Sequence, residues 1–372
     1  MATSPSPSTP AITLEVLPAA YGDCLLVSCP VGRGTWRMLV DTGTDEVYPV
    51  LRQRLTKLPL AADGRRHIDL FVVTHIDHDH IGGAALLLAD KALGVAFGDV
   101  WFNAPPGPAA RGVAEGEALG HLLGAGGVAL PWNRAWSGRP VCTPAVGGNV
   151  AWAARRGAPR LTLLSPGPQQ LQDLYKVWEK ELERLRRKER DAPEPEPPQE
   201  RGEPASLQAL ASRVTPVDRS VPNGSAIAFL LEHRGASVLL CADAFPTVLV
   251  PALKALAKQR GLHGPLAVDA IKLSHHGSRA NVTTDLLAAV KAPQHVFSTN
   301  NAIFKHPGEE AVARAILSGG EPTLWFNHDT EQNRRWDAAA LKAQHGYQVR
   351  YPARPGEGVV LELPAHPPTA RS

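Results

Sequence analysis

The sequence predicts an α/β fold in which sheets form a sandwich and helices lie outside it. Apolar segments of strand length alternate with amphipathic segments of helix length in both halves of the 372-residue chain. Loops rich in His and Asp follow several of the apolar segments. Alternating strands and helices are typical of layered α/β domains. Hydrophobic residues make up 44% of the chain and charged residues 20%, which excludes a wholly disordered protein.

The first half of the chain begins with strands. Two apolar runs flank a turn over residues 12–30 and predict a strand, a turn and a strand. A third strand is predicted over 35–40, and apolar residues at helical spacing predict a helix over 46–58. A buried strand over 68–73 leads into a polar loop, after which an apolar helix starts at Ala84.

The middle of the chain changes in composition. A short strand over 161–166 is followed by a charged amphipathic helix over 169–190. Residues 191–204 are rich in Pro and Glu, which predicts a disordered or extended segment. The second half then repeats the earlier pattern, with a hairpin over 226–241, helices over 246–259, 283–290 and 309–317, and strands over 267–273, 295–298 and 323–326.

These elements predict one domain over residues 11–364. A charged helix and Pro-rich insertion over 169–220 interrupts it, and residues 1–10 and 365–372 form tails. A chain of this length can bury a substantial core.

Charge and cysteine content narrow the class of protein. A net charge of +3 is too small to indicate a nucleic-acid binder by itself. None of the 4 cysteines forms a Cys-x-x-Cys pair, so a zinc ribbon and a thioredoxin-type motif are excluded. We find no signal peptide and no apolar run near the ~20 residues that span a bilayer. We therefore predict a soluble cytoplasmic protein with no membrane partner.

The strongest functional signal is the segment THIDHDHIGG over residues 74–83. Five imidazole and carboxylate side chains fall within six of its positions, namely His75, Asp77, His78, Asp79 and His80. Without partners these groups would repel one another, and a divalent cation removes that repulsion. We therefore predict a metal-binding loop, the alternative being a polar surface turn.

This loop resembles the metal-binding loop of the metallo-β-lactamase superfamily, which reads His-x-His-x-Asp-His before a pair of small residues. The resemblance implies a four-layered αββα sandwich and a metal-dependent hydrolase. His75 matches the first His, and Asp77 stands where the family has its second His. By the same resemblance His75 and Asp77 would hold a first metal, and Asp79 and His80 a second.

Other motifs of this superfamily follow in the expected order. LVDTG implies that Asp41 supports the metal loop from behind. LLCADAF makes Asp243 the candidate bridging carboxylate, although an ordinary Asp at a strand end is the alternative. SHHGS supplies the last His of the site. We favour His275 as that ligand, with His276 facing the substrate, and the choice between them stays open.

The whole motif series resembles the hydrolase domain of the ComEC family of DNA-uptake channel proteins, here without a membrane channel. That family carries Asn-x-Ser before a strand, matched by Asn223 and Ser225, and a late His-Pro, matched by His306. Asn223 and Ser225 are therefore candidate substrate-binding residues. The family often has Ser where this chain has Asn281.

The resemblance also bears on the metal. The segment VPNGS offers Asn223 where the superfamily has a third His for the first metal. Oxygen ligands suit hard cations better than an all-His site does. We therefore predict one or two divalent ions, with Mn²⁺ favoured and Zn²⁺ or Mg²⁺ as alternatives.

Phosphodiester hydrolysis by an activated hydroxide is the reaction that this resemblance implies. Asp79 would orient the hydroxide, and His276 or His306 would protonate the leaving oxygen. Ser278 and Lys305 would hold phosphate oxygens, unless they are an ordinary loop hydroxyl and a solvated lysine. DNA or another phosphodiester is the expected substrate, which makes the protein a soluble DNA nuclease.

Two alternative functions stay open from the sequence. The first is a small-molecule hydrolase of the same fold, acting on a lactone, a thioester or a cyclic nucleotide. The second is an interaction or effector module in a multi-protein system, whose protein partner would dock on residues 191–204.

Overall fold

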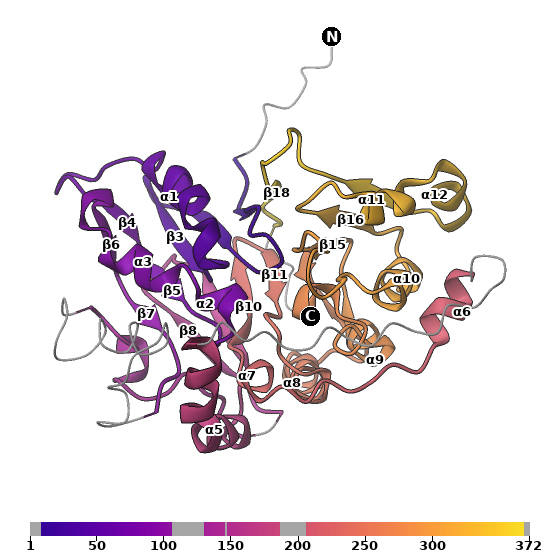
Figure 1. Ribbon diagram of the computed structural model, residues 1–372, viewed down its shortest axis with the longest axis horizontal. Coiled ribbons are helices and arrows are strands. Elements are labelled where there is room, and N and C mark those ends of the chain that lie inside the picture. Colours follow the sequence, from indigo (N-terminus) through magenta and orange to yellow (C-terminus); the bar gives the residue numbers. More distant parts are fainter. Residues whose placement is uncertain (1–8, 106–129, 146, 187–205, 368–372) are drawn as a thin grey trace, which may run out of the picture.

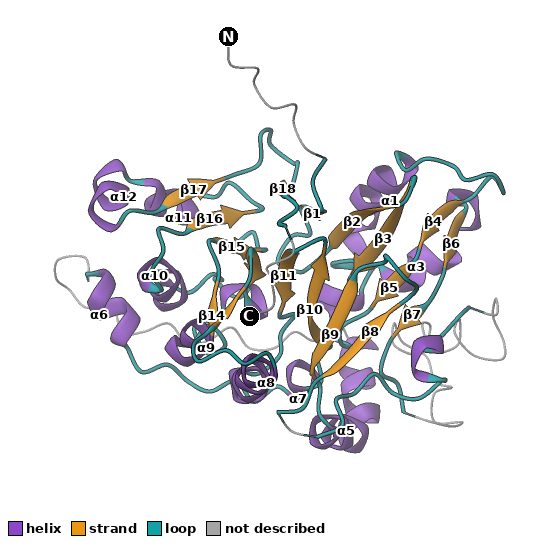
Figure 2. Cartoon of the chain, turned by 180° about the vertical axis from the view of Figure 1, so that it is seen from behind, coloured by secondary structure: helices purple, strands orange, loops and turns teal. Residues whose placement is uncertain are grey.

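Two β-sheets stacked face to face organise the chain in the computed structural model (Figures 1 and 2). The structure describes residues 9–105, 130–145, 147–186 and 206–367. Residues 191–204, the predicted docking segment, lie outside these ranges.

The first sheet is built from the N-terminal third of the chain and the C-terminal strand. Within the described residues its strand order is β18-β1-β2-β3-β5-β7. The bounds are Val359–Leu363 (β18), Ile12–Val16 (β1), Leu25–Val31 (β2), Gly34–Val40 (β3), Leu70–Val72 (β5) and Val100–Trp101 (β7).

The second sheet takes strands from the rest of the described chain, in the order β17-β16-β15-β13-β11-β10-β9-β8. The bounds are Gln348–Arg350 (β17), Thr323–Phe326 (β16), Gln294–Phe297 (β15), Ala270–Lys272 (β13), Ala236–Leu240 (β11), Ala228–His233 (β10), Arg160–Ser165 (β9) and Val150–Ala153 (β8). Two small two-stranded sheets pair Arg66–Ile68 (β4) with Val95–Phe97 (β6) and Leu266–Ala267 (β12) with Val290–Lys291 (β14).

Helices cover the outer faces of both sheets. Beside the first sheet lie Tyr48–Thr56 (α1), His78–Ile81 (α2), Ala84–Ala89 (α3) and Pro168–Arg186 (α5). The remaining described helices are Leu207–Ser212 (α6), Val221–Gly224 (α7), Pro246–Gln259 (α8), Thr284–Ala289 (α9), Glu309–Leu317 (α10), Glu331–Arg334 (α11) and Ala339–His345 (α12).

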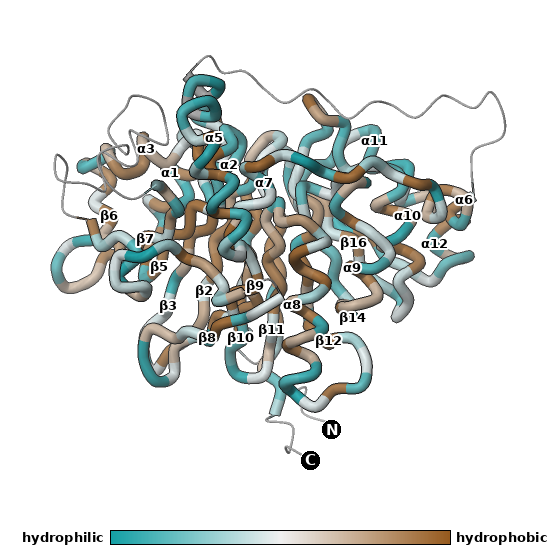
Figure 3. The backbone as a smooth tube through the Cα atoms, turned by 90° about the horizontal axis from the view of Figure 1, so that it is seen from below, coloured by the Kyte–Doolittle hydropathy of each residue, from teal (hydrophilic) through white to brown (hydrophobic). Residues whose placement is uncertain are grey.

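The central strands are apolar on both faces because both faces are buried. In β2, Val27 enters the core between the sheets while Leu26 packs under the outer helices. In β10, Phe229 faces the core between the sheets while Leu230 packs toward the helices beside the second sheet. Side chains alternate along a strand, so a strand buried on both faces reads as a continuous apolar run. Figure 3 shows this as hydrophobic strands between more polar outer segments.

Three hydrophobic cores therefore separate four layers. One lies between the sheets, one under α1, α3 and α5, and one under α6, α8, α9 and α10. This arrangement confirms the predicted four-layered αββα class.

The predicted insertion contributes to these layers. Leu174 and Trp178 of α5 are buried in the core under the first sheet's helices. Helix α6 packs against α10 in the outer layer of the second sheet. Part of the segment predicted as an insertion thus packs as a piece of the domain.

The sheet topology gathers several strand ends at one rim. Strands β3 and β5 are parallel neighbours, as are β11 and β13. The carboxyl ends of parallel strands meet at the same edge of a sheet. The loops that carry Asp41, residues 74–83, Asp243 and residues 274–278 therefore begin at this rim. Among the described helices, none combines the length and apolar character needed to cross a bilayer.

Candidate metal centre

The predicted metal loop is held from two sides by the backbone of the first sheet. Thr42 N donates to His80 O at 2.9 Å, and Asp23 N donates to Asp79 O at 3.1 Å. Gly22 lies so close that an added Cβ would sit 1.8 Å from Asp79 O. Only glycine allows this approach, so the Gly-Asp turn before β2 is built to hold the loop.

Asp41 orients His80 from behind the loop. The carboxylate accepts from Thr74 N at 2.7 Å, and its Oδ2 lies 2.7 Å from His80 Nδ1. Nδ1 therefore carries the proton, and Nε2 turns toward the other loops. Burial lowers the pKa of His80, but the carboxylates of Asp243, Asp41 and Asp79 outweigh it and raise the pKa well above its ordinary value. Carboxylate–imidazole pairs of this kind are typical behind metal-ligating histidines.

His75 presents an unpartnered nitrogen to the same centre. Thr74 Oγ1 donates to Asp41, so it accepts from His75 Nδ1 at 2.9 Å. The buried Nε2 of His75 has no hydrogen-bond partner among the described residues, and lies 3.7 Å from Asp77 Oδ2 and 3.9 Å from Asp243 Oδ2. Burial, together with the positive charge of His80, lowers the pKa of His75 to about 3. The ring is therefore neutral, with a lone pair facing two carboxylates.

His276 is oriented by a buried ion pair. Its Nδ1 lies 3.2 Å from Asp23 Oδ1 and 3.0 Å from Ser298 O. The other oxygen of Asp23 lies 2.5 Å from Lys272 Nζ, and both side chains are buried. Burial would raise the pKa of Asp23, but the charges of Lys272 and His276 hold it well below its ordinary value. Asp23 therefore stays ionised behind His276.

His275 is held by a different group of polar side chains. Its Nδ1 lies 3.3 Å from Asp218 Oδ2 and 3.2 Å from Asn281 Oδ1. Asp218 Oδ2 also accepts from the amides of Asn223 and Asn281, each at 2.9 Å. The His275 side chain is 20% exposed, whereas that of His276 is 0% exposed. His275 is thus positioned as firmly as His276 but nearer to solvent.

The inward-facing atoms converge on Asp243. His80 Nε2 and His276 Nε2 lie only 3.1 Å apart, and Asp79 Oδ2 lies 3.1 Å from His276 Nε2. Asp243 Oδ1 lies 3.4 Å from His80 Nε2, and its Oδ2 lies 3.6 Å from His276 Nε2 and 3.7 Å from His275 Nε2. Burial opposes ionisation of Asp243, but His80, His276 and His275 hold its pKa well below its ordinary value. A carboxylate thus sits among four imidazoles.

This cluster fits a divalent metal ion. One ligand atom each from Asp23, His80, Asp243 and His276 lies within 4.8 Å of the others, and all four residues are buried. The unpartnered His75 Nε2 and Asp243 Oδ1 are the buried polar atoms that a cation would satisfy. Mixed imidazole and carboxylate donors suit divalent transition metals. Because Lys272 already neutralises Asp23, we assign Asp23 to orienting His276 and Asp79 to facing the cation.

The first half of this site also lies within a match to a known protein family. Residues 21–135 match the family model described as metallo-beta-lactamase superfamily. Over these residues the chain matches the metallo-β-lactamase superfamily. The match contains Asp23, Asp41 and the whole metal loop, so the superfamily assignment rests on the part of the chain that builds one side of the cluster.

Other comparisons place the chain beside solved structures. No curated protein matches it. It is similar to a mutant of the CmlA beta-hydroxylase at 13% identity and a TM-score of 0.41, over 95% of this chain and 54% of that one, so it spans about half the hydroxylase chain. It is also similar to a metallo-beta-lactamase motif mutant from Cronobacter sakazakii (Enterobacter sakazakii) at 14% identity and a TM-score of 0.28, over 71% of this chain and 78% of that one.

The geometry favours other roles for the two adjacent histidines than the sequence predicted. We favoured His275 as the ligand and His276 as the residue facing substrate. The structure buries His276 among Asp79, His80 and Asp243, and leaves His275 partly exposed. This geometry favours the reverse assignment. The physical reason is the left-handed backbone at both residues, which aims their rings in different directions.

His306 is placed poorly for the proton transfer predicted for it. It is buried, its ring centroid 5.0 Å from that of His275 and 6.0 Å from that of Phe304. Burial, helped by the positive charges of His275 and His276, holds its pKa well below the ordinary value. A neutral, enclosed imidazole is a much weaker acid than an imidazolium, so it is poorly suited to protonate a leaving oxygen.

The predicted substrate-binding residues fall into two groups. Ser225 and Ser278 are buried, and their hydroxyls bond within their own loops, to Pro222 O at 2.7 Å and from Ala280 N at 3.1 Å. Those contacts disfavour direct binding of substrate. Asn223 lies in the Asp218 network beside His275, and Lys305 is exposed at the same rim.

Sequence reasoning missed Asp23, Lys272 and Asp218 as parts of the site. A single lysine inside the apolar strand β13 was a usable signal, because a buried lysine requires a partner. Asp218 gave no such signal, since it lies in the segment predicted as an insertion.

Proposed function

We propose that this protein is a metal-dependent phosphodiesterase that cleaves DNA. The observation that carries the proposal is the oxygen-rich cluster, in which Asp77, Asp79 and Asp243 face His75, His80 and His276 within one buried centre. The motif series that resembles the hydrolase domain of the ComEC family supports the same substrate class.

Six side chains would hold one or two divalent ions, with Mn²⁺ favoured. These side chains belong to His75, Asp77, Asp79, His80, Asp243 and His276. A bound divalent ion supplies an acidified water near neutral pH and positive charge for the phosphoryl oxygens. Asp41 and Asp23 keep the imidazole Nε2 atoms of His80 and His276 directed at this centre. Preorientation of this kind avoids rearrangement during the reaction.

His275 is the residue that we assign to the leaving oxygen. Its Nδ1 is fixed by Asp218 and Asn281, so its Nε2 points past Asp243 with a partly exposed ring. A positioned imidazole can donate a proton to an alkoxide as it departs. Asp218 is then a positioning residue, which acts through the histidine rather than on the substrate.

The substrate would enter from the solvent side of His275. Lys305 is exposed at this rim and supplies a positive charge for a backbone phosphate. The net charge of +3 is compatible with this, because attraction to phosphate depends on local charges and on the bound cation.

The test is hydrolysis of single- and double-stranded DNA by the purified full chain. The protein would be stripped of metal and then supplied with Mn²⁺, Mg²⁺ or Zn²⁺. A small phosphodiester and a lactone would be tested as comparison substrates. We expect cleavage of DNA that depends on added metal and is greatest with Mn²⁺. Cleavage of the lactone without cleavage of either phosphodiester would overturn the proposal and favour a small-molecule hydrolase.

A matched pair of variants tests whether the proposed ligands are needed for cleavage. Asp79→Ala with His80→Ala removes two proposed ligands, and Asp285→Asn changes one carboxylate in the first turn of α9. DNA cleavage should vanish in the first and persist in the second. Equal cleavage by both would contradict the proposed site.

A further inference from the structure

A second pocket lies at the opposite rim of the sandwich from the cluster. It has a volume of about 550 Å³ and is lined by residues of three turns and the strands beside them. The turns join β2 to β3, β8 to β9 and β10 to β11. Asp41 follows the last residue of β3, whereas Gly32 precedes its first, so the strand of 7 residues separates the two places by about 20 Å.

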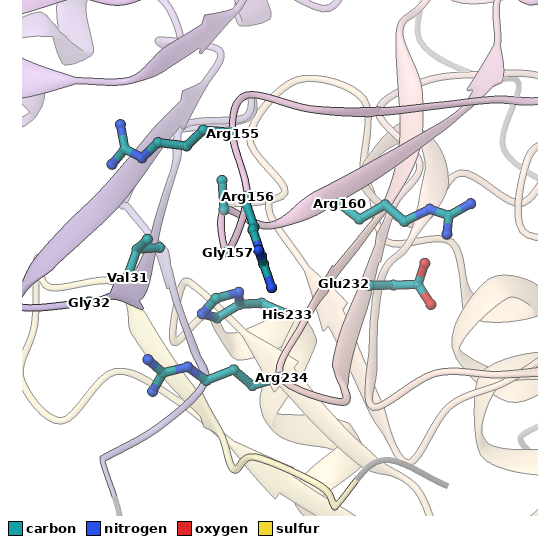
Figure 4. Close-up of a pocket in the computed structure, with 10 residues that line it drawn as sticks. Val31, Gly32, Arg155, Arg156, Gly157, Arg160, Glu232, His233 and Arg234 are labelled. Carbon is teal, nitrogen blue, oxygen red and sulfur yellow. The ribbon is translucent and has the colours of Figure 1, made fainter. Parts of the chain in front are cut away.

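Arginines dominate the charge of this pocket. Arg155, Arg156, Arg160 and Arg234 line it with a single carboxylate, Glu232. Figure 4 shows Arg156 extending toward His233, while Arg155 points away from both. Volumes of this size are typical of sites for small organic ligands.

The positive charges are not compensated by neighbouring acids. Both oxygens of Glu232 accept from Arg260, at 2.9 Å and 2.8 Å. Arg155 lies 3.8 Å from Asp69. Within the described part of the chain, Arg156, Arg160 and Arg234 make no side-chain hydrogen bond or ion pair. Three guanidinium groups therefore retain all their donors for a ligand.

The turn that carries Arg234 is an unusual place for an arginine. Arg234 has φ +49°, and Gly235 after it has φ +83°. Two-residue hairpin turns with positive φ at both positions favour Asn-Gly or Asp-Gly. An arginine at the first position costs conformational energy. His366 N donates to Arg234 O at 3.0 Å, but among the described residues no hydrogen bond or ion pair involves the guanidinium group, which is left for a ligand.

We propose that this pocket binds a phosphate-bearing small molecule of nucleotide size. Guanidinium groups match phosphate oxygens in paired hydrogen bonds. The limited volume of the pocket suits a compact ligand better than a long strand of nucleic acid. This site is separate from the proposed catalytic function, and its ligand is not the substrate of the cluster.

The experiment is calorimetric titration of the full chain with AMP, inorganic phosphate and a short single-stranded oligonucleotide. It would use the Asp243→Asn variant as well as the native protein, so that binding at the cluster is distinguished from binding at the pocket. We expect AMP to bind both proteins with the same affinity. Arg156→Ala combined with Arg234→Ala should weaken AMP binding about tenfold or more.

The matched control is Arg354→Ala, which changes an exposed arginine in the loop before β18. It should bind AMP as the native protein does. Undiminished affinity in the double arginine variant would overturn the proposal. So would binding of the oligonucleotide without binding of AMP, or the absence of binding by all three ligands.

Discussion

At one rim of the sandwich four imidazoles are each held at Nδ1 by a nearby oxygen atom, whereas at the other rim three arginines have no side-chain partner among the described residues. The oxygens that hold the imidazoles belong to Thr74, Asp41, Asp23 and Asp218. The arginine side chains extend from exposed turns. Buried charge has to be compensated inside the fold, since it has lost its water, while exposed charge does not. The first rim is therefore organised by the protein, and the second is available to a ligand.

The largest effect on metal content and DNA cleavage is expected when the carboxylate of Asp243 is removed. Asp243→Asn deletes the negative charge that faces His75, His80, His275 and His276. We expect bound metal and DNA cleavage to fall to background, measured by elemental analysis and by a cleavage assay. Full metal content in this variant would show that the cluster is not organised around Asp243.

Breaking the buried ion pair between Asp23 and Lys272 tests whether pairing of buried charges stabilises the rim that carries the cluster. Lys272→Met leaves Asp23 buried without its cation, and loss of one partner of a buried pair costs about 3–5 kcal/mol. The free energy of unfolding, measured by urea denaturation, should fall by that amount. Adding Asp23→Asn should recover much of the loss. An unchanged stability in the single variant would contradict the role of the pair.

His295 is a buried imidazole that, unlike those of the cluster, has no carboxylate partner among the described residues. It lies in β15 and is 1% exposed, and burial lowers its pKa to about 4. The folded state therefore favours the neutral ring. This contribution is complete above the unfolded pKa of about 6.5 and is lost as pH falls toward 4, by up to about 3 kcal/mol. His295→Gln should flatten the decline of stability between these pH values, and an identical decline in variant and native protein would exclude His295 as its source.

Asp218→Asn addresses positioning at the partly exposed histidine. The amide keeps the size of the side chain but weakens its hold on His275 Nδ1. Changes to such supporting residues commonly reduce activity about 10–100-fold. We expect kcat to fall in this range with an altered pH profile, whereas Asp329→Asn, at an exposed ion pair, should change neither. A change confined to stability would assign Asp218 a structural role.

The smallest effect on stability and on DNA cleavage is expected from changes to the arginines of the second pocket. Arg156→Ala and Arg234→Ala remove side chains with no partner in the described fold, and such surface changes usually alter stability by less than about 0.5 kcal/mol. Thermal unfolding and DNA cleavage should both match the native protein. A clear loss of stability would show that these arginines take part in the fold.

The sequence predicted the layers well because the strands are buried on both faces. Continuous apolar runs such as Phe229–Leu231 are hard to mistake, and the loops that follow them carry the His and Asp residues. Edge strands such as β8 and β17 were missed, since short strands with one exposed face carry a weak pattern. Topology then placed Asp41, His80 and Asp243 at one rim without any further information.

The details of the site depended on backbone conformation, which sequence patterns do not give. The left-handed residues His275 and His276 decide which ring enters the cluster, and local preference offers no guide to two such residues in succession. Asp218 reaches His275 only because the chain returns to the rim after α6. Contacts between segments so far apart in sequence follow from the packed fold.

The most direct test of the buried cluster as a metal site is to locate the metal. Crystals of the native protein grown with Mn²⁺ would be measured at a wavelength where manganese scatters anomalously. We expect an anomalous peak about 2.0–2.3 Å from ligand atoms of Asp79, His80, Asp243 and His276. A map without a peak at this centre, or with manganese bound only elsewhere, would contradict the claim that the buried cluster is a metal site.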